Sequence, residues 1–81
     1  GSIEGRVLPA AANALVYAIN GTDTASTKPE REGEFRIVGL KAGTYRLFID
    51  ATANGYIDRT IENVVVVNKE DSKTGTITLI K

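Results

Sequence analysis

Carboxylates are the side chains of this sequence with the widest scope for chemistry, because the chain contains no histidine and no cysteine. That composition removes Ser–His and Cys–His nucleophile pairs and the usual zinc ligand sets. Glu30, Glu32 and Glu34 stand at alternate positions, so an extended backbone would place them on one face, where they could bind a hard cation such as calcium. The alternative is a solvated loop that enters a strand, with Arg31 and Arg36 nearby to balance the charge. We favour the loop and expect no metal site and no cofactor.

Asp50 and Asp58 flank an Asn54-Gly55 turn and could meet across it as an acid/base pair. Sugar-cleaving pairs of this kind normally lie beside aromatic platforms, and the chain has no tryptophan. None of the glycine-containing segments has the spacing of a phosphate-binding loop. We therefore expect no catalytic residues, and the sequence does not predict an enzyme.

Length and charge limit the number of domains and the kinds of partner that the chain can have. Eighty-one residues make one domain, 1–81, which we expect to be a fragment of a longer protein. Ten basic and ten acidic residues cancel and are scattered, which gives no electrostatic reason to expect nucleic acid as a partner. No apolar run exceeds six residues, and Val64-Val65-Val66-Val67 is far too short to span a bilayer, so this segment is not expected to insert into a membrane.

Residues 33–49 organise the fold that we expect. Alternating apolar and polar residues predict two half-buried strands, joined by a short loop into a hairpin. Gly39 and Gly43 can adopt positive φ, so the loop can turn sharply around Leu40, which we place in the core. The inward-facing residues of the two strands are Phe35, Ile37, Tyr45, Leu47 and Ile49. The hydroxyl of Tyr45 is expected to bond to backbone upstream, as in the tyrosine corner of other sandwiches.

Further strands are predicted at 3–8, 14–19, 22–27, 56–67 and 74–80, with short turns between them. Asn20-Gly21 predicts a type I′ hairpin turn, and the long strand region is expected to bulge near Glu62-Asn63. No segment reads as a convincing helix. The pattern predicts an all-β fold: a single immunoglobulin-like sandwich of about seven strands in two antiparallel or mixed sheets.

Several short motifs, in this order and spacing, resemble the carboxypeptidase regulatory-like domain family, whose fold is a transthyretin-like β-sandwich. The motifs are Gly5-Arg6-Val7, Asn13-Ala14-Leu15-Val16-Tyr17-Ala18, Gly33-Glu34-Phe35-Arg36-Ile37, the segment 39–47 and Gly55-Tyr56. The Thr-Asp pair that the family usually carries before Gly-x-Phe is replaced by the longer charged loop 28–32.

The resemblance implies a non-catalytic structural or protein-contact module of a secreted, periplasmic or surface-anchored bacterial protein. Its expected partners are neighbouring domains of the same polypeptide or another protein, and weak homo-oligomers fit the same expectation. Some relatives bind starch, so a carbohydrate-binding module is the alternative function.

A candidate contact face follows from the inward placement of small residues on the second strand. If Ala14, Val16 and Ala18 face the core, their neighbours face outward, and the same alternation turns residues of 33–49 outward. In an immunoglobulin-like strand order these side chains would merge into one apolar patch, and large exposed patches mark contact surfaces. A covering loop or a reversed second strand would remove the patch. The residues of this expected face are Leu15, Tyr17, Ile19, Val38 and Phe48.

The same face bears on the carbohydrate alternative. Sugar binding usually stacks a ring on an exposed tryptophan or tyrosine. We assign Tyr45 and Tyr56 to the core, which leaves Tyr17 as the free aromatic candidate.

Overall fold

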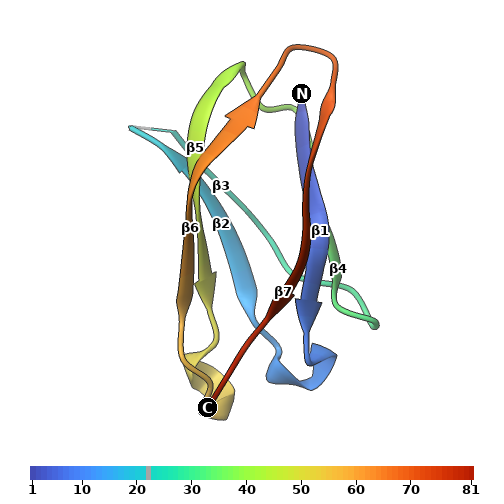
Figure 1. The fold of residues 1–81 in the computed structure, drawn as a ribbon, viewed down its shortest axis with the longest axis vertical. Helices are drawn as coiled ribbons and strands as arrows, with labels where there is room; N and C mark the ends of the chain where they lie inside the picture. The colour runs from blue at the N-terminus through green and yellow to red at the C-terminus, as the bar shows by residue number, and fades with distance from the viewer. Residues whose placement is uncertain (22) are drawn as a thin grey trace.

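A computed structural model describes residues 1–21 and 23–81 as a β-sandwich of two facing sheets (Figure 1). The elements are β1 Ser2–Leu8, η1 Ala10–Ala12, β2 Leu15–Asn20, β3 Asp23–Thr27, β4 Glu34–Ile37, β5 Gly43–Asp50, η2 Thr52–Asn54, β6 Arg59–Val66 and β7 Asp71–Thr78, where η1 and η2 are single 3-10 turns. The first sheet has the order β4-β1-β7 and the second the order β3-β2-β5-β6. β1 pairs in parallel with β7, so the first sheet is mixed and the second is antiparallel. The predicted all-β sandwich is confirmed.

The core lies between the sheets and follows the alternation of the strands. Leu47 and Ile49 of β5 and Val16 of β2 are fully buried from one sheet, and Ile3 is fully buried from the other. The expected core positions are buried except Leu40 and Tyr56, which are partly buried and pack against the core. The remaining buried apolar residues are Val7, Ala12, Ala14, Ala18, Phe35, Ile37, Tyr45, Ala51, Val64, Val66, Ile77 and Leu79.

The predicted pairing of the two strands in 33–49 is wrong. β4 pairs with β1, whereas β5 pairs with β2 and β6, so the segment is an arch that crosses from one sheet to the other. Phe35 and Ile37 belong to one inner face of the sandwich and Leu47 and Ile49 to the opposite one. An arch and a hairpin produce the same alternation in sequence, because in both cases each strand has one buried face. The positive φ expected in the loop is confirmed at Gly39, where φ is 73°.

The first hairpin and the bulge are the other local predictions. Asn20 is still in β2 and pairs with Asp23, so it is the last residue of the strand and not the first turn residue that was predicted, while Gly21 has the expected positive φ, 56°. The predicted strand start at Thr22 lies outside the described residues. The bulge is confirmed: the β5–β6 register shifts between Tyr45 and Leu47, opposite Asn63, whose φ is 59°. The described residues include no helix long and apolar enough to cross a bilayer.

Candidate contact face

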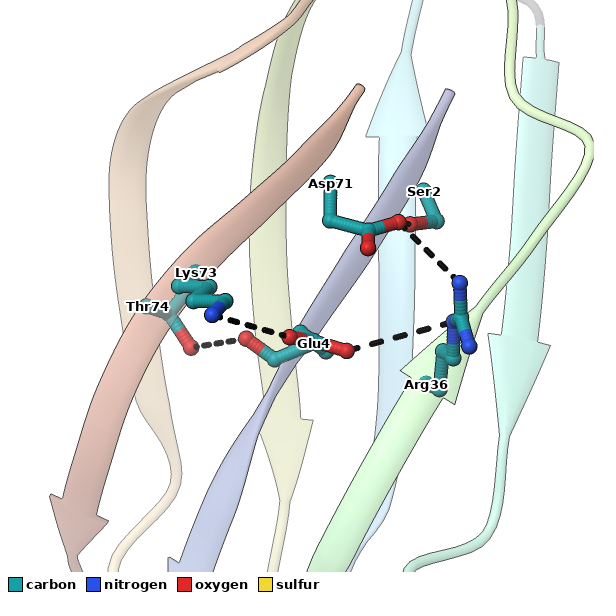
Figure 2. Close-up of polar contacts among 6 residues, drawn as sticks. All are labelled: Ser2, Glu4, Arg36, Asp71, Lys73 and Thr74. Carbon is teal, nitrogen blue, oxygen red and sulfur yellow. Dashed lines mark hydrogen bonds and ion pairs between the residues drawn. The ribbon is translucent and has the colours of Figure 1, made fainter. Parts of the chain in front are cut away.

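The outer face of the three-stranded sheet is densely charged. Arg36 contacts both Glu4 (3.9 Å) and Asp71 (3.1 Å), and Figure 2 shows it between these two carboxylates. Arg6 pairs with Glu34 at 3.5 Å, and Lys73 approaches Glu4 at 4.0 Å. Because these acids and bases already lie beside opposite charges within the sheet, this face is suited to contact with water.

The Asp71 carboxylate has the best-defined surroundings on this face. The Ser2 hydroxyl donates to Oδ1 of Asp71, and Arg36 Nη2 donates to the same oxygen at 3.1 Å (Figure 2). The hydrogen bond from Ser2, followed by the charge and hydrogen bond of Arg36, lowers the pKa of Asp71 below its ordinary value of 3.8.

This shift predicts a small acid dependence of stability. A carboxyl pKa that is lower in the folded state stabilises the fold above the unfolded pKa, and that contribution disappears as the pH falls through the folded pKa. Asp71→Asn should therefore be less stable than the wild type at neutral pH, and the difference should shrink below about pH 4. Urea unfolding at pH 7 and pH 2.5 measures the difference. A difference that stays constant with pH would contradict the assignment.

The outer face of the four-stranded sheet is different in character. Tyr17 of β2 pairs with Phe48 of β5, and their ring centroids lie 6.3 Å apart at an interplanar angle of 36°. Leu15 is 39% exposed, and Ile19 is half-buried on the same strand. The structure thus brings together four of the five predicted residues, because the small residues Ala14, Val16 and Ala18 fill the inner side of β2. We refer to Leu15, Tyr17, Ile19 and Phe48 as the apolar face.

Val38 is not part of this face. It follows β4, which belongs to the three-stranded sheet, and its side chain is 65% exposed there. The prediction that Val38 would merge with the others depended on a β4–β5 hairpin, and the arch places the two strands in different sheets.

Polar residues around the apolar face were not singled out from the sequence. In register with Tyr17 and Phe48 lie Ser26 of β3 and Thr60 of β6. Next to Ile19 lies Arg46, whose Nε contacts Oε1 of Glu62 at 2.9 Å. A surface hollow of about 390 Å³ adjoins this ion pair, lined by Ile19, Asn20, Gly21, Thr44, Tyr45, Arg46, Glu62 and Asn63. The sequence did contain a signal for Arg46, because the alternation along β5 places Arg46 and Asp50 on the same side of the strand as Phe48.

The carboxylates considered as catalytic or metal-binding groups have local structural partners. Asp58 Oδ1 accepts a hydrogen bond from the Ala51 N–H at 2.8 Å, and Asp50 Oδ1 accepts from the hydroxyl of Thr52 at 3.0 Å. Both therefore hold the chain around η2. Glu34 is paired with Arg6, and within residues 1–21 and 23–81 no three acidic side chains gather as metal ligands would.

The three tyrosines have distinct environments. Tyr45 is buried and its hydroxyl donates to the Lys41 carbonyl oxygen at 2.9 Å, as the tyrosine-corner prediction requires. Tyr56 is only partly buried, which corrects its assignment to the core, and Lys81 Nζ lies 5.2 Å from its ring centroid. The Tyr17 ring lies at the surface beside Phe48.

Comparisons with known proteins agree with this architecture. Among solved structures, the chain is similar to part of the complex Coh3ScaB-XDoc_M2ScaA, a C-terminal interface mutant of a type II Cohesin-X-Dockerin complex from Acetivibrio cellulolyticus, with 24% identity and a TM-score of 0.71. It is also similar to part of the corresponding N-terminal interface mutant from the same organism, with 23% identity and a TM-score of 0.74. In both cases the match covers 96% of this chain and 56% of the other.

These identities show a shared fold, and this chain spans little more than half the length of the chains it matches. Among curated proteins, none matches this chain. The family model of the carboxypeptidase regulatory-like domain matches residues 2–80, nearly the whole chain. The chain therefore belongs to the carboxypeptidase regulatory-like domain family.

Proposed function

We propose that this domain is a non-catalytic protein-contact module of an extracytoplasmic bacterial protein and that it binds through the apolar face. The observation that carries the proposal is the contrast between the two outer faces of the sandwich. The outer face of the three-stranded sheet is covered by ion pairs. The outer face of the four-stranded sheet presents two aromatic and two aliphatic side chains side by side. Interface centres are depleted in charge and enriched in aromatic residues, with arginine prominent among hot spots.

The surroundings of the apolar face fit the same role. Serine and threonine flank the aromatic pair on both neighbouring strands, and the ion pair of Arg46 and Glu62 lies at one end. A polar rim around an apolar centre is the usual anatomy of an interface. The family membership and the likeness to chains crystallised as cohesin–X–dockerin complexes support a module that works beside other protein domains. Its partners would be neighbouring domains of the same polypeptide or another protein outside the cytoplasm.

Replacing both Tyr17 and Phe48 with Ser tests whether the face is free for contact. Both side chains are only half-buried, so the double variant should lose less than about 2 kcal/mol of unfolding free energy, against roughly 3–5 kcal/mol for one buried aromatic. At about 1 μM protein, the wild type should enhance the fluorescence of anilinonaphthalene sulfonate, a probe of exposed apolar surface, and the variant should not.

Val38→Ser is the matched control, because it removes an equally apolar exposed side chain from the other sheet. The control should keep the dye signal. A fall in stability typical of core residues, or a dye signal unchanged by the double variant, would refute the free apolar face.

A glycan array separates the protein-contact role from the carbohydrate alternative. The protein-contact proposal expects no binding to starch-like glucans above background. Glucan binding that disappears in Tyr17→Ser would instead assign the face to sugar stacking.

A further inference from the structure

We propose that the occupant of the apolar face is a second copy of this chain, packed face to face about a two-fold axis that lies in the interface, above the line joining Tyr17 and Phe48 and roughly parallel to it. This inference rests on the proposed function, since it names the partner of the same face. It follows from the order of side chains on the two strands. On β2 the residues on either side of that line are both apolar, and on β5 they carry opposite charges.

The register of the sheet supplies the symmetry. Tyr17 and Phe48 are paired across the two strands, so one line perpendicular to the strands passes through both. On β2, Leu15 and Ile19 lie two residues to either side of that line. On β5, Asp50 and Arg46 lie two residues to either side, with Asp50 opposite Leu15 and Arg46 opposite Ile19. Each flanking residue is thus about 7 Å from the line, on the outer side of the sheet.

A two-fold rotation about an axis above this line and parallel to it places each residue over its mirror position in the second copy. Ile19 then faces Leu15 of the other copy, so apolar side chains meet apolar side chains. Arg46 faces Asp50 of the other copy, and symmetry makes this ion pair twice. On the central strands β2 and β5, the face is therefore self-complementary in both hydrophobicity and charge, which is what an isologous interface requires.

The expected packing angle leaves this complementarity intact. Facing sheets pack about 10 Å apart, with strand directions rotated by about 30°. At a radius of about 7 Å this rotation displaces facing side chains by about 3–4 Å, which the long side chain of Arg46 can span. Arg46 is already held at 2.9 Å by Glu62, so less side-chain freedom is lost on binding. Asp58 would lie nearest Glu62 of the other copy, and these like charges oppose association. The apolar contact and the two Arg46–Asp50 pairs must outweigh that repulsion, while Oδ1 of Asp58 is directed to the Ala51 N–H.

Charge reversal tests the pairing directly. Sedimentation equilibrium of the wild-type chain from about 10 μM to 1 mM should show a reversible monomer–dimer equilibrium. Arg46→Glu alone, or Asp50→Arg alone, replaces two attractive pairs with two repulsive pairs and should weaken dimerisation at least about tenfold. The double variant that carries both changes restores opposite charges across the axis and should recover most of the affinity. Arg6→Glu, on the opposite face, is the control and should leave dimerisation unchanged.

Crosslinking provides a measurement that does not depend on the charged residues. A residue on a two-fold axis meets its own copy, and Ser26 lies on the line of Tyr17 and Phe48. The chain has no cysteine, so Ser26→Cys should give a covalent dimer with a short bis-maleimide, and Val38→Cys should not. A wild type that stays monomeric to 1 mM, or a Ser26→Cys variant that does not crosslink, overturns the dimer. If the dye signal is still lost in Tyr17→Ser/Phe48→Ser, the contact face survives and its partner is a different protein.

Discussion

Leu47→Ala is expected to lower the free energy of unfolding by about 2–5 kcal/mol. Leu47 lies in the middle of β5, is fully buried, and is paired with Ala18 on one side and Ile61 on the other. Truncation would leave a cavity between the sheets, which neighbouring strands cannot close without breaking their own pairing. The loss is a large part of the total stability, roughly 4–12 kcal/mol for a domain of this size. Urea unfolding monitored by far-UV circular dichroism measures it.

Thr44→Ala on the same strand serves as the control, because Thr44 points outward and is exposed. Its effect should stay within about 0.5 kcal/mol. A loss below about half a kcal/mol for Leu47→Ala would mean that β5 presents its other side to the core. Since a one-residue slip exchanges the two faces of a strand, that result would also place Phe48 inside and remove the apolar face.

Gly33→Ala is expected to destabilise the domain by about 3 kcal/mol or more, from backbone strain and steric overlap together. Gly33 has a φ of 86°, and a methyl group there would overlap the carbonyl oxygen of Val7. The same glycine accepts the Val7 N–H at 2.8 Å, so relief of the overlap would disturb the β1–β4 pairing. Thermal unfolding should show a marked fall in Tm.

Gly39→Ala separates backbone strain from steric overlap as causes of the destabilisation. Gly39 also has a positive φ, of 73°, but a methyl group there would meet nothing within 4 Å. Its cost should be about 1–2 kcal/mol, the usual penalty of a left-handed conformation for an ordinary residue. Equal effects of the two substitutions would show that close approach of Val7 does not matter.

The sequence was sufficient for properties that depend on one strand at a time. Alternation predicted which side chains are buried, and Glu62-Asn63 predicted the bulge that interrupts β6. Alternation carries no information about which strand lies next to which. Residues 33–49 therefore read as a hairpin, although the two strands pack across the core from separate sheets.

The residues of the candidate site also divide into those that one strand's alternation predicts and those that depend on which strands are neighbours. Leu15, Tyr17 and Ile19 were predicted together because they lie on one strand. Phe48 was added because an immunoglobulin-like strand order would make its strand a neighbour, and β2 and β5 are indeed paired. Val38 was misplaced because its position depends on the path of the arch. Arg46 and Asp50 were missed as members of the face because their significance comes from the cross-strand register, which fixes their positions relative to the Tyr17–Phe48 line.

The parallel pairing of β1 with β7 has a mechanical consequence. The first and last strands lie side by side, and the two ends of the described chain are at opposite ends of the 34 Å long axis (Figure 1). Tension applied to the two ends would pull β1 and β7 in opposite directions along their common length. The hydrogen bonds between them would be loaded together in shear, rather than opened one after another. A domain joined to its neighbours through these ends would therefore resist tension through the whole set of β1–β7 hydrogen bonds at once.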